Sequence, residues 1–214
     1  MQIQKSRSVL TSVEREKFMG TAQPIREKEE LQKFINYYQD VQPSPRNEAL
    51  IVLGLHTALR ISDILSLRWQ DVYDFEQKCY HSHLFIREKK TGKKTVIAIN
   101  SHVKKALDAL KKERKAVTSD NYIFTKSTDY TAPLNRSQAY RIVKHAAEDA
   151  LHEEHISCHS LRKTFGYYAW KQGTPPALLM DIYNHSSYAV TKKYLGIEQD
   201  ERDSIFMEID FYKN

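Results

Sequence analysis

The sequence has few features of a secreted or membrane-bound protein. Its 214 residues include two cysteines, Cys79 and Cys158, which lie far apart in the chain. We interpret them as free thiols in a reducing compartment. No apolar run is long enough to span a membrane, and residues 1–17 contain no signal-peptide core. These absences predict a cytoplasmic protein without a membrane partner.

The chain carries an excess of positive charge on an otherwise ordinary globular composition. Hydrophobic residues make up 41% of it, which argues against a disordered chain. The net charge is +6 at pH 7. This charge favours a polyanionic partner, most simply nucleic acid, although many basic proteins bind none.

The N-terminal segment is the only biased part of a sequence that has no internal repeats. Residues 1–25 are polar and basic and predict a mobile arm, since they show no sustained apolar period. The cations Lys5, Arg7, Arg15 and Lys17 either contact a DNA backbone or belong to a solvated tail. The sequence leaves both interpretations open.

The rest of the chain predicts a mainly helical domain with a small antiparallel sheet, an α+β fold. Helices are predicted from apolar periodicity and capping residues at 26–39, 47–59, 63–69 after a Ser62 cap, 101–115 and 136–152. Strands are predicted at 80–88 and 93–99, joined by a turn at 89–92, with 71–75 as an optional third strand. The segment 121–134 is predicted to be irregular.

Three short helical segments are predicted between residues 157 and 196. The first begins near Ser157 and ends before Gly173, and Thr174 with Pro175 opens the second. After an interruption at Asn184, Ser186 or Ser187 caps the third, which ends at Gly196. Residues i and i+3 share a helix face, so His159 and Arg162 on the first segment point toward one place.

The side chains that phosphate chemistry needs can come together at that place. Attack on a phosphodiester builds negative charge on oxygen, and planar guanidinium groups stabilise that charge bidentately. Arg60 and Arg162 are the predicted pair. Tyr194 is the predicted nucleophile, because a phenol beside cations and a base can attack phosphorus. Lys90, on the tip of the predicted hairpin, can protonate the leaving sugar oxygen.

Two histidines complete the predicted site. His159 and His185 can hydrogen-bond the phosphoryl oxygens or transfer the proton of the tyrosine. No metal ion is needed, because the arginines supply the positive charge. No ATP is needed, because a phosphotyrosyl ester conserves the energy of the broken bond. The predicted set of cofactors is therefore empty.

A second group of side chains resembles a metal site and is weighed against that chemistry. His152, His155, Cys158 and His159 lie within eight residues. Zinc sites prefer paired ligands in two separated halves, and no second half is evident. We therefore predict no metal site here, and the sequence leaves the role of His152, His155 and Cys158 open.

Five motifs, in order, resemble those of the tyrosine recombinase (phage integrase) family. They are A-L-R-I-S-D at 58–63, E-K-K-T-G-K at 88–93, C-H-S-L-R-K-T-F at 158–165, N-H-S-S at 184–187 and T-K-K-Y-L-G at 191–196. In order, they would supply Arg60 with the supporting Asp63, Lys90, the pair His159 and Arg162, His185, and Tyr194.

The resemblance implies the fold and activity of a tyrosine recombinase catalytic domain over residues 26–203. Tyr194 would form a 3′-phosphotyrosyl link to double-stranded DNA. Two strand exchanges would follow on a homotetramer, with a Holliday junction between them. The apolar segment 204–214 would either pack on its own domain or dock on a neighbouring subunit. Family members usually carry a separate core-binding domain, so the short N-terminal region implies either a compact member or a fragment.

Alternatives remain for single residues. Arg60 can simply pair with Asp63 one turn further on. The choice of Lys90 over Lys89 comes from the resemblance, because a charged hairpin tip is usually solvated. Tyr183 and Tyr188 are the nearest rivals of Tyr194, and a buried tyrosine is usually a packing residue.

Two other functions are weighed against a site-specific recombinase that integrates or rearranges DNA. A type IB topoisomerase-like enzyme would nick and close DNA with the same chemistry and would not pair two sites. A catalytically silent DNA-binding regulator would keep the fold alone, but it would not need a phenol beside two arginines. The sequence predicts neither the DNA target nor whether the reaction integrates, excises or resolves.

Overall fold

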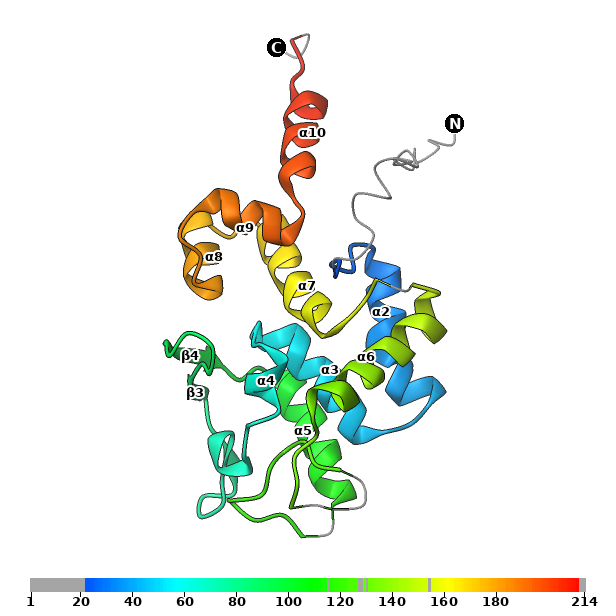
Figure 1. Ribbon diagram of the computed structural model, residues 1–214, viewed down its shortest axis with the longest axis vertical. Helices are drawn as coiled ribbons and strands as arrows, with labels where there is room; N and C mark the ends of the chain where they lie inside the picture. The colour runs from blue at the N-terminus through cyan, green and yellow to red at the C-terminus, as the bar shows by residue number, and fades with distance from the viewer. Residues whose placement is uncertain (1–21, 115, 127–128, 130, 154, 212–214) are drawn as a thin grey trace.

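A computed structural model describes residues 22–211, apart from 115, 127, 128, 130 and 154, and the four cations of the predicted arm lie outside this part. Helices dominate it, and the strands form two separate two-stranded antiparallel sheets (Figure 1). The predicted α+β class is therefore confirmed. Within the described residues, no helix has the length and apolar character needed to cross a membrane.

Helix α3 (Pro45–Thr57) is the centre of the molecule. It is apolar on nearly all sides and is buried along most of its length. The Ser44 side chain accepts a hydrogen bond from the amide of Asn47, Pro45 occupies the first helical position, and Ala58 ends the helix with a φ of 53°. Among the helices that lie against it are α2 (Lys28–Asn36), α5 (Ser101–Glu113), α6 (Arg136–Leu151) and α7 (Cys158–Lys171).

The first predicted helix begins and ends two residues later than its apolar pattern indicates, and it is less regular. Its α-helical part, α2, continues as a π-helix, η1 (Tyr37–Val41). Phe34 and Tyr38, four positions apart, are buried as on one helical face, and the wider turn also buries Tyr37. Periodicity at 3.6 residues does not predict this second tyrosine, because a π turn shifts the inward face by one position.

The predicted N-cap of the helix at 63–69, Ser62, is wrong. Helix α4 covers only Ile61–Ile64, and its N-cap is Arg60, two residues before Ser62. The amide of Asp63 donates to the carbonyl oxygen of Arg60 at 2.9 Å, so a backbone bond closes the first turn. The chain then turns into a 3₁₀-helix, η2 (Trp69–Asp71).

The two hairpins are separate. Strands β3 (His83–Arg87) and β4 (Lys94–Ala98) pair as predicted, with Leu84 opposite Ile97. Strand β1 (Tyr73–Asp74) pairs instead with β2 (Cys79–Tyr80). The optional third strand therefore belongs to its own small sheet.

Residues 158–195 fold into the three helical segments that the capping residues, prolines and glycines predicted. They are α7 and, after it, α8 (Pro176–Tyr183) and α9 (Tyr188–Leu195). Ser187 caps α9 by accepting from the amide of Val190, and Gly196 ends it with a φ of 71°. The N-cap of α8 is Pro175, not Thr174. Gly166 on α7 lets the helices approach, because a Cβ there would lie 2.4 Å from the Tyr183 hydroxyl.

The segment before α2 belongs to the folded domain. Ile25 is buried, and its amide donates to the Thr164 hydroxyl at 2.9 Å. Arg26 pairs with Asp200 at 2.8 Å and donates to the carbonyl oxygen of Gly196 at 2.6 Å. We call residues 23–26 the N-terminal strap. The predicted arm, which ran to residue 25, therefore ends too late.

Helix α10 (Glu198–Glu208) projects away from the other helices (Figure 1). It exposes Ile205, Phe206 and Met207, and Phe211 beyond it is 90% exposed. These side chains do not pack on the described part of their own domain, and docking on a neighbouring subunit stays a prediction.

Candidate active site

The two arginines enter the site from the ends of two helices. Arg60 immediately precedes α4, and Arg162 lies in the first half of α7, where it is 3% exposed. The guanidinium of Arg162 donates to the carbonyl oxygen of Ala58, the residue that ends α3. This bond ties the first motif to the third across about a hundred residues of sequence.

The predicted nucleophile lies against an aromatic cluster beneath the arginines. The ring centroid of Tyr194 is 5.3 Å from that of Tyr183 and 5.2 Å from that of His185, which meets it edge-on. Burial raises the pKa of Tyr194 above its ordinary value, and the charges of Arg162 and Arg60 oppose this shift. Both arginines therefore act on the same phenol.

His185 is held in one orientation. It follows Asn184, which ends α8 in the left-handed region, and its Nδ1 lies 3.1 Å from the hydroxyl oxygen of Thr191. Because Thr191 occupies Nδ1, Nε2 is the nitrogen that can contact the phenol or a phosphoryl oxygen. Burial lowers the pKa of His185, and the charges of Arg162 and Arg60 lower it further. The ring is therefore neutral at pH 7 and able to accept a proton.

His159 and Lys90 come from two distant parts of the chain. His159 lies in the first turn of α7, and Lys90 is exposed in the turn of the β3–β4 hairpin. Desolvation lowers the pKa of His159, and the charges of Arg162, Lys163, Arg60 and Lys90 add to the effect. Arg60 and Arg162 therefore lie within electrostatic reach of His159, His185 and Tyr194, and Lys90 lies within reach of His159.

The rival tyrosines have other partners. The hydroxyl of Tyr183 donates to the carbonyl oxygen of Arg162 at 2.8 Å, and burial strongly raises the pKa of this phenol. The hydroxyl of Tyr188 donates to Glu201, and burial together with that carboxylate raises its pKa to about 12. Both phenols therefore hold structural hydrogen bonds.

Asp63 joins the two sides of the site through the backbone. It is fully buried, and its Oδ1 accepts a hydrogen bond from the amide of Lys89 at 2.9 Å. Its Oδ2 is buried and has no hydrogen-bond partner within the described residues. Asp63 thus does not pair with Arg60 in this structure. Instead it holds the strand end that leads into Lys90.

Two residues near the site were not predicted from the sequence. Glu88 is 2% exposed and forms an ion pair with Arg60. Lys163 places its ammonium nitrogen 5.1 Å from the centroid of the Tyr194 ring, and burial lowers its pKa. The position of Lys163 beside Arg162 was an available signal. Glu88 had none, because an acid in the run R-E-K-K is typical of a solvated turn.

The four residues that resemble a metal site in the sequence lie at the end of α6, in the following loop and at the start of α7. In the described part of the chain, no three histidine, cysteine, aspartate or glutamate side chains gather in a way that could hold a metal ion. His152 ends α6 in the left-handed region, whereas Cys158 starts α7 and is half-buried. Cys79 and Cys158 are both free thiols, as predicted.

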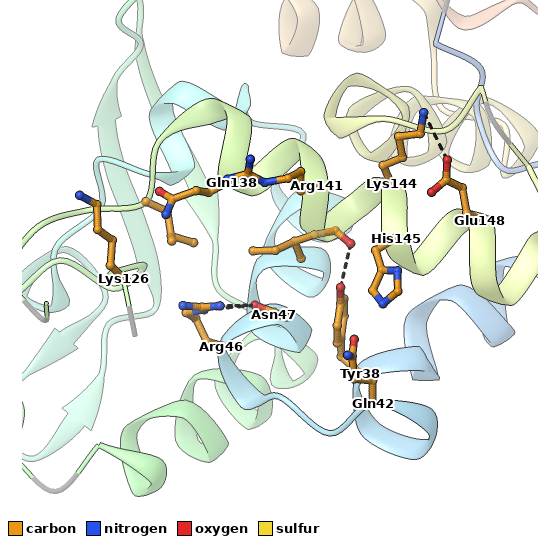
Figure 2. Close-up of a pocket in the computed structure, with 12 residues that line it drawn as sticks. Tyr38, Gln42, Arg46, Asn47, Lys126, Gln138, Arg141, Lys144, His145 and Glu148 are labelled. Carbon is orange, nitrogen blue, oxygen red and sulfur yellow. Dashed lines mark hydrogen bonds and ion pairs between the residues drawn. The ribbon is translucent and has the colours of Figure 1, made fainter. Parts of the chain in front are cut away.

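A separate basic pocket of about 600 Å³ lies between α3 and α6 (Figure 2). Its cations are Arg46, Lys126, Arg141 and Lys144, of which Lys144 pairs with Glu148 at 3.2 Å. Arg46 is near the start of α3, whereas Arg162 contacts the residue just past its end. A helix of this length spans about 20 Å, so the pocket is distinct from the site around Tyr194.

Two curated proteins are similar to this chain in sequence. A probable integrase/recombinase, YoeC of Bacillus subtilis (strain 168), is 38% identical over 85% of this chain and 93% of its own length. The type 1 fimbriae regulatory protein FimE of Escherichia coli (strain K12) is 29% identical over 70% of this chain and 73% of its own.

Solved structures share the fold at low sequence identity. The XerA recombinase superposes with a TM-score of 0.69 at 19% identity, over 89% of this chain and 68% of that one. The XerH recombinase, bound to its palindromic difH substrate, gives a TM-score of 0.68 at 23% identity, over 88% and 55%. The sequence model of the phage integrase family matches residues 25–201. The chain therefore belongs to the phage integrase family.

Proposed function

We propose that this protein is a site-specific DNA recombinase that cleaves and rejoins DNA through a covalent bond to Tyr194. The observation that carries the proposal is the convergence of Arg60 and Arg162 on the Tyr194 phenol. Family membership and the XerH structure with its DNA substrate support the same substrate class.

In the proposed cleavage step, the phenol oxygen of Tyr194 attacks the scissile phosphorus. The bond from phosphorus to the 5′ oxygen of the next sugar breaks, which leaves a 3′-phosphotyrosyl ester and a free 5′-hydroxyl. Arg60 and Arg162 bind the non-bridging oxygens and stabilise their growing charge. Reversal of the step by the 5′-hydroxyl of a different strand exchanges the strands.

The proposed proton transfers follow from the ionisation states. The phenol enters the reaction protonated, because burial raises the pKa of Tyr194. Nε2 of neutral His185 accepts that proton, and His159 is held neutral to hydrogen-bond a phosphoryl oxygen. Lys90 gives a proton to the departing 5′ oxygen. No metal ion is required, because the arginines supply the positive charge, and no nucleotide is required, because the ester conserves the bond energy.

The proposed DNA contacts extend beyond the site. The basic pocket between α3 and α6 presents further cations that suit a phosphate backbone (Figure 2). The exposed apolar side chains of α10 suit docking on a neighbouring copy in a tetramer on DNA. A nicking-closing enzyme, which does not pair two sites, has no need of such a surface.

Capture of the covalent intermediate tests this function. The protein is incubated with a library of nicked duplexes, and DNA that remains bound after denaturation is sequenced to define the attachment site. Wild-type protein should yield an adduct, and Tyr194→Phe should bind the same DNA without one. An equal adduct from the Phe variant would exclude Tyr194 as the nucleophile. Supercoil relaxation without joining of two sites would favour the topoisomerase-like alternative.

A further inference from the structure

The buried carboxylate of Glu88 occupies a position that the reaction steps above do not use. Glu88 directly follows β3, where the hairpin turn begins, and its exposed fraction is 2%. A carboxylate buried this deeply is stable only where cations and hydrogen-bond donors replace water. The groups that contact the Glu88 carboxylate therefore explain how its buried charge is stabilised.

Three donors from two parts of the chain surround the Glu88 carboxylate. The guanidinium of Arg60 forms an ion pair with Oε2. The hydroxyl of Thr91 donates to Oε2 at 3.0 Å, and the hydroxyl of Thr95 lies 3.4 Å from Oε1. Arg60 comes from the first motif, whereas both threonines belong to the hairpin. The carboxylate thus joins the arginine to the hairpin that carries Lys90.

The backbone of Glu88 also closes the turn. Its amide donates to the carbonyl oxygen of Lys93 at 2.9 Å, and its carbonyl oxygen accepts from the amide of Gly92 at 2.8 Å. Lys90 lies between these bonds. Any shift of Glu88 therefore moves the turn and Lys90 with it.

A second contact holds the far side of the same turn. The ammonium group of Lys93 lies 2.6 Å from Oδ1 of Asp181 on α8 and 2.7 Å from the carbonyl oxygen of that residue. Figure 1 shows the hairpin turn beneath α8, the helix that leads to His185. Lys93 thus holds the turn to α8 and Asp63 holds the amide of Lys89, whereas the Glu88 side chain bonds to Arg60 itself.

We propose that Glu88 is a positioning residue that fixes the Arg60 guanidinium and the turn that carries Lys90 in one geometry. Arg60, which binds the phosphate, and Lys90, which donates the proton, then act together on the same phosphate. The proposal rests on the proposed function. It predicts that loss of Glu88 impairs two steps at once: stabilisation of the phosphoryl oxygens and protonation of the 5′ oxygen.

A sulfur substrate separates these two effects. In a duplex whose bridging 5′ oxygen at the scissile phosphate is replaced by sulfur, the leaving group is a thiolate, which departs without a proton. Single-turnover cleavage by Lys90→Ala should fall about 100-fold on the oxygen substrate and recover on the sulfur substrate. Glu88→Ala should lose about 100-fold and recover roughly 10-fold, because the Arg60 defect remains.

Milder variants and a control accompany Glu88→Ala. Glu88→Gln keeps the shape and the acceptor oxygen and should lose about 10-fold. Thr91→Val removes one donor at an exposed turn position, so it tests the contact even where the Glu88 variants fold poorly; it should lose about 3-fold. Glu76→Gln makes the same charge change at an exposed position and should cleave like the wild type. DNA affinity should stay within about 2-fold throughout.

The outcomes distinguish this inference from the proposed function. An inactive wild-type protein would overturn the proposed function itself. If the wild type forms the adduct while the Glu88 and Thr91 variants cleave at its rate, only the role of Glu88 is overturned. Equal losses on the oxygen and sulfur substrates would make Glu88 a counter-ion of Arg60 alone. Faster cleavage by Glu88→Gln would make it a competitor of the phosphate, and either result overturns the positioning role.

Discussion

Replacing Gly166 by alanine should destabilise the protein and slow cleavage together. Gly166 lies on α7 where α8 and α9 cross closest to it. An added Cβ would meet the Tyr183 hydroxyl at 2.4 Å and Cδ2 of Leu195 at 2.5 Å. Ordinary contacts between carbon atoms are about 3.5–4.0 Å, so each neighbour would have to move by about 1 Å. Neither side chain has space for that, since both are fully buried.

The expected cost follows from three effects. Overpacking of a buried contact costs about 1–3 kcal/mol. The displaced Tyr183 hydroxyl loses its bond to the Arg162 carbonyl, which costs about 1 kcal/mol. Alanine recovers about 1 kcal/mol through its higher helix propensity. The net loss is about 1–3 kcal/mol, which lowers the melting temperature of a chain of this size by about 3–10 °C.

Thermal unfolding followed by circular dichroism measures this loss, and single-turnover cleavage measures the displacement of α9. The exposed Lys112→Ala, on α5, is the control and should change stability by less than about 0.5 kcal/mol. Adding Tyr183→Phe removes the closest atom, so the double variant should lose less than the sum of the single variants. A Gly166→Ala protein as stable as the wild type would refute the packing argument.

Three further predictions concern the site and the basic pocket. Arg162→Lys should reduce cleavage about 100-fold or more, because an ammonium cannot hold two phosphoryl oxygens; near-normal cleavage would refute the bidentate role. The cleavage rate should be constant near pH 7 and fall only at a pH below the ordinary histidine pKa of about 6.5, because burial lowers the pKa of His185 and keeps it neutral; a rise on acidification would exclude it as the proton acceptor. Arg141→Ala should reduce the slope of log affinity against log salt by about 0.9, whereas an unchanged slope would remove this pocket from the DNA interface.

Local chemistry made much of the fold predictable from the sequence. Helix α3 is apolar on all sides, and a buried position is the only stable one for such a helix. The limits of α9 follow from a serine that accepts an amide and a glycine that takes a positive φ, at Ser187 and Gly196. These signals depend only on near neighbours in the chain.

Other features of the fold were not predictable from the sequence. Ser62 has the chemistry of a cap, but the position of Arg60 decides where α4 begins. The partner of β1 depends on a turn, and the π-helix at Tyr37 depends on packing against α6. The burial of Glu88 is the clearest example, because only the folded chain brings Arg60 to an acid in a charged run.

The six predicted site residues came from the order of five motifs, and their individual roles remain proposals. The sequence could not reveal that Asp63 holds the amide of Lys89 instead of Arg60. A carboxylate three positions after an arginine favours a pair on one helix. Here α4 is a single turn, and the arginine precedes it, so its side chain is free to reach the hairpin.

The N-terminal strap limits where this chain can be shortened. Arg26 grips the carbonyl oxygen of Gly196, two residues beyond Tyr194, and Tyr168 donates to the carbonyl oxygen of Arg26 at 3.0 Å. A variant trimmed to begin at α2 would keep every helix yet release this grip on the end of the nucleophile helix. Tags and fusion partners therefore belong upstream of residue 22, joined by a linker that leaves the strap seated.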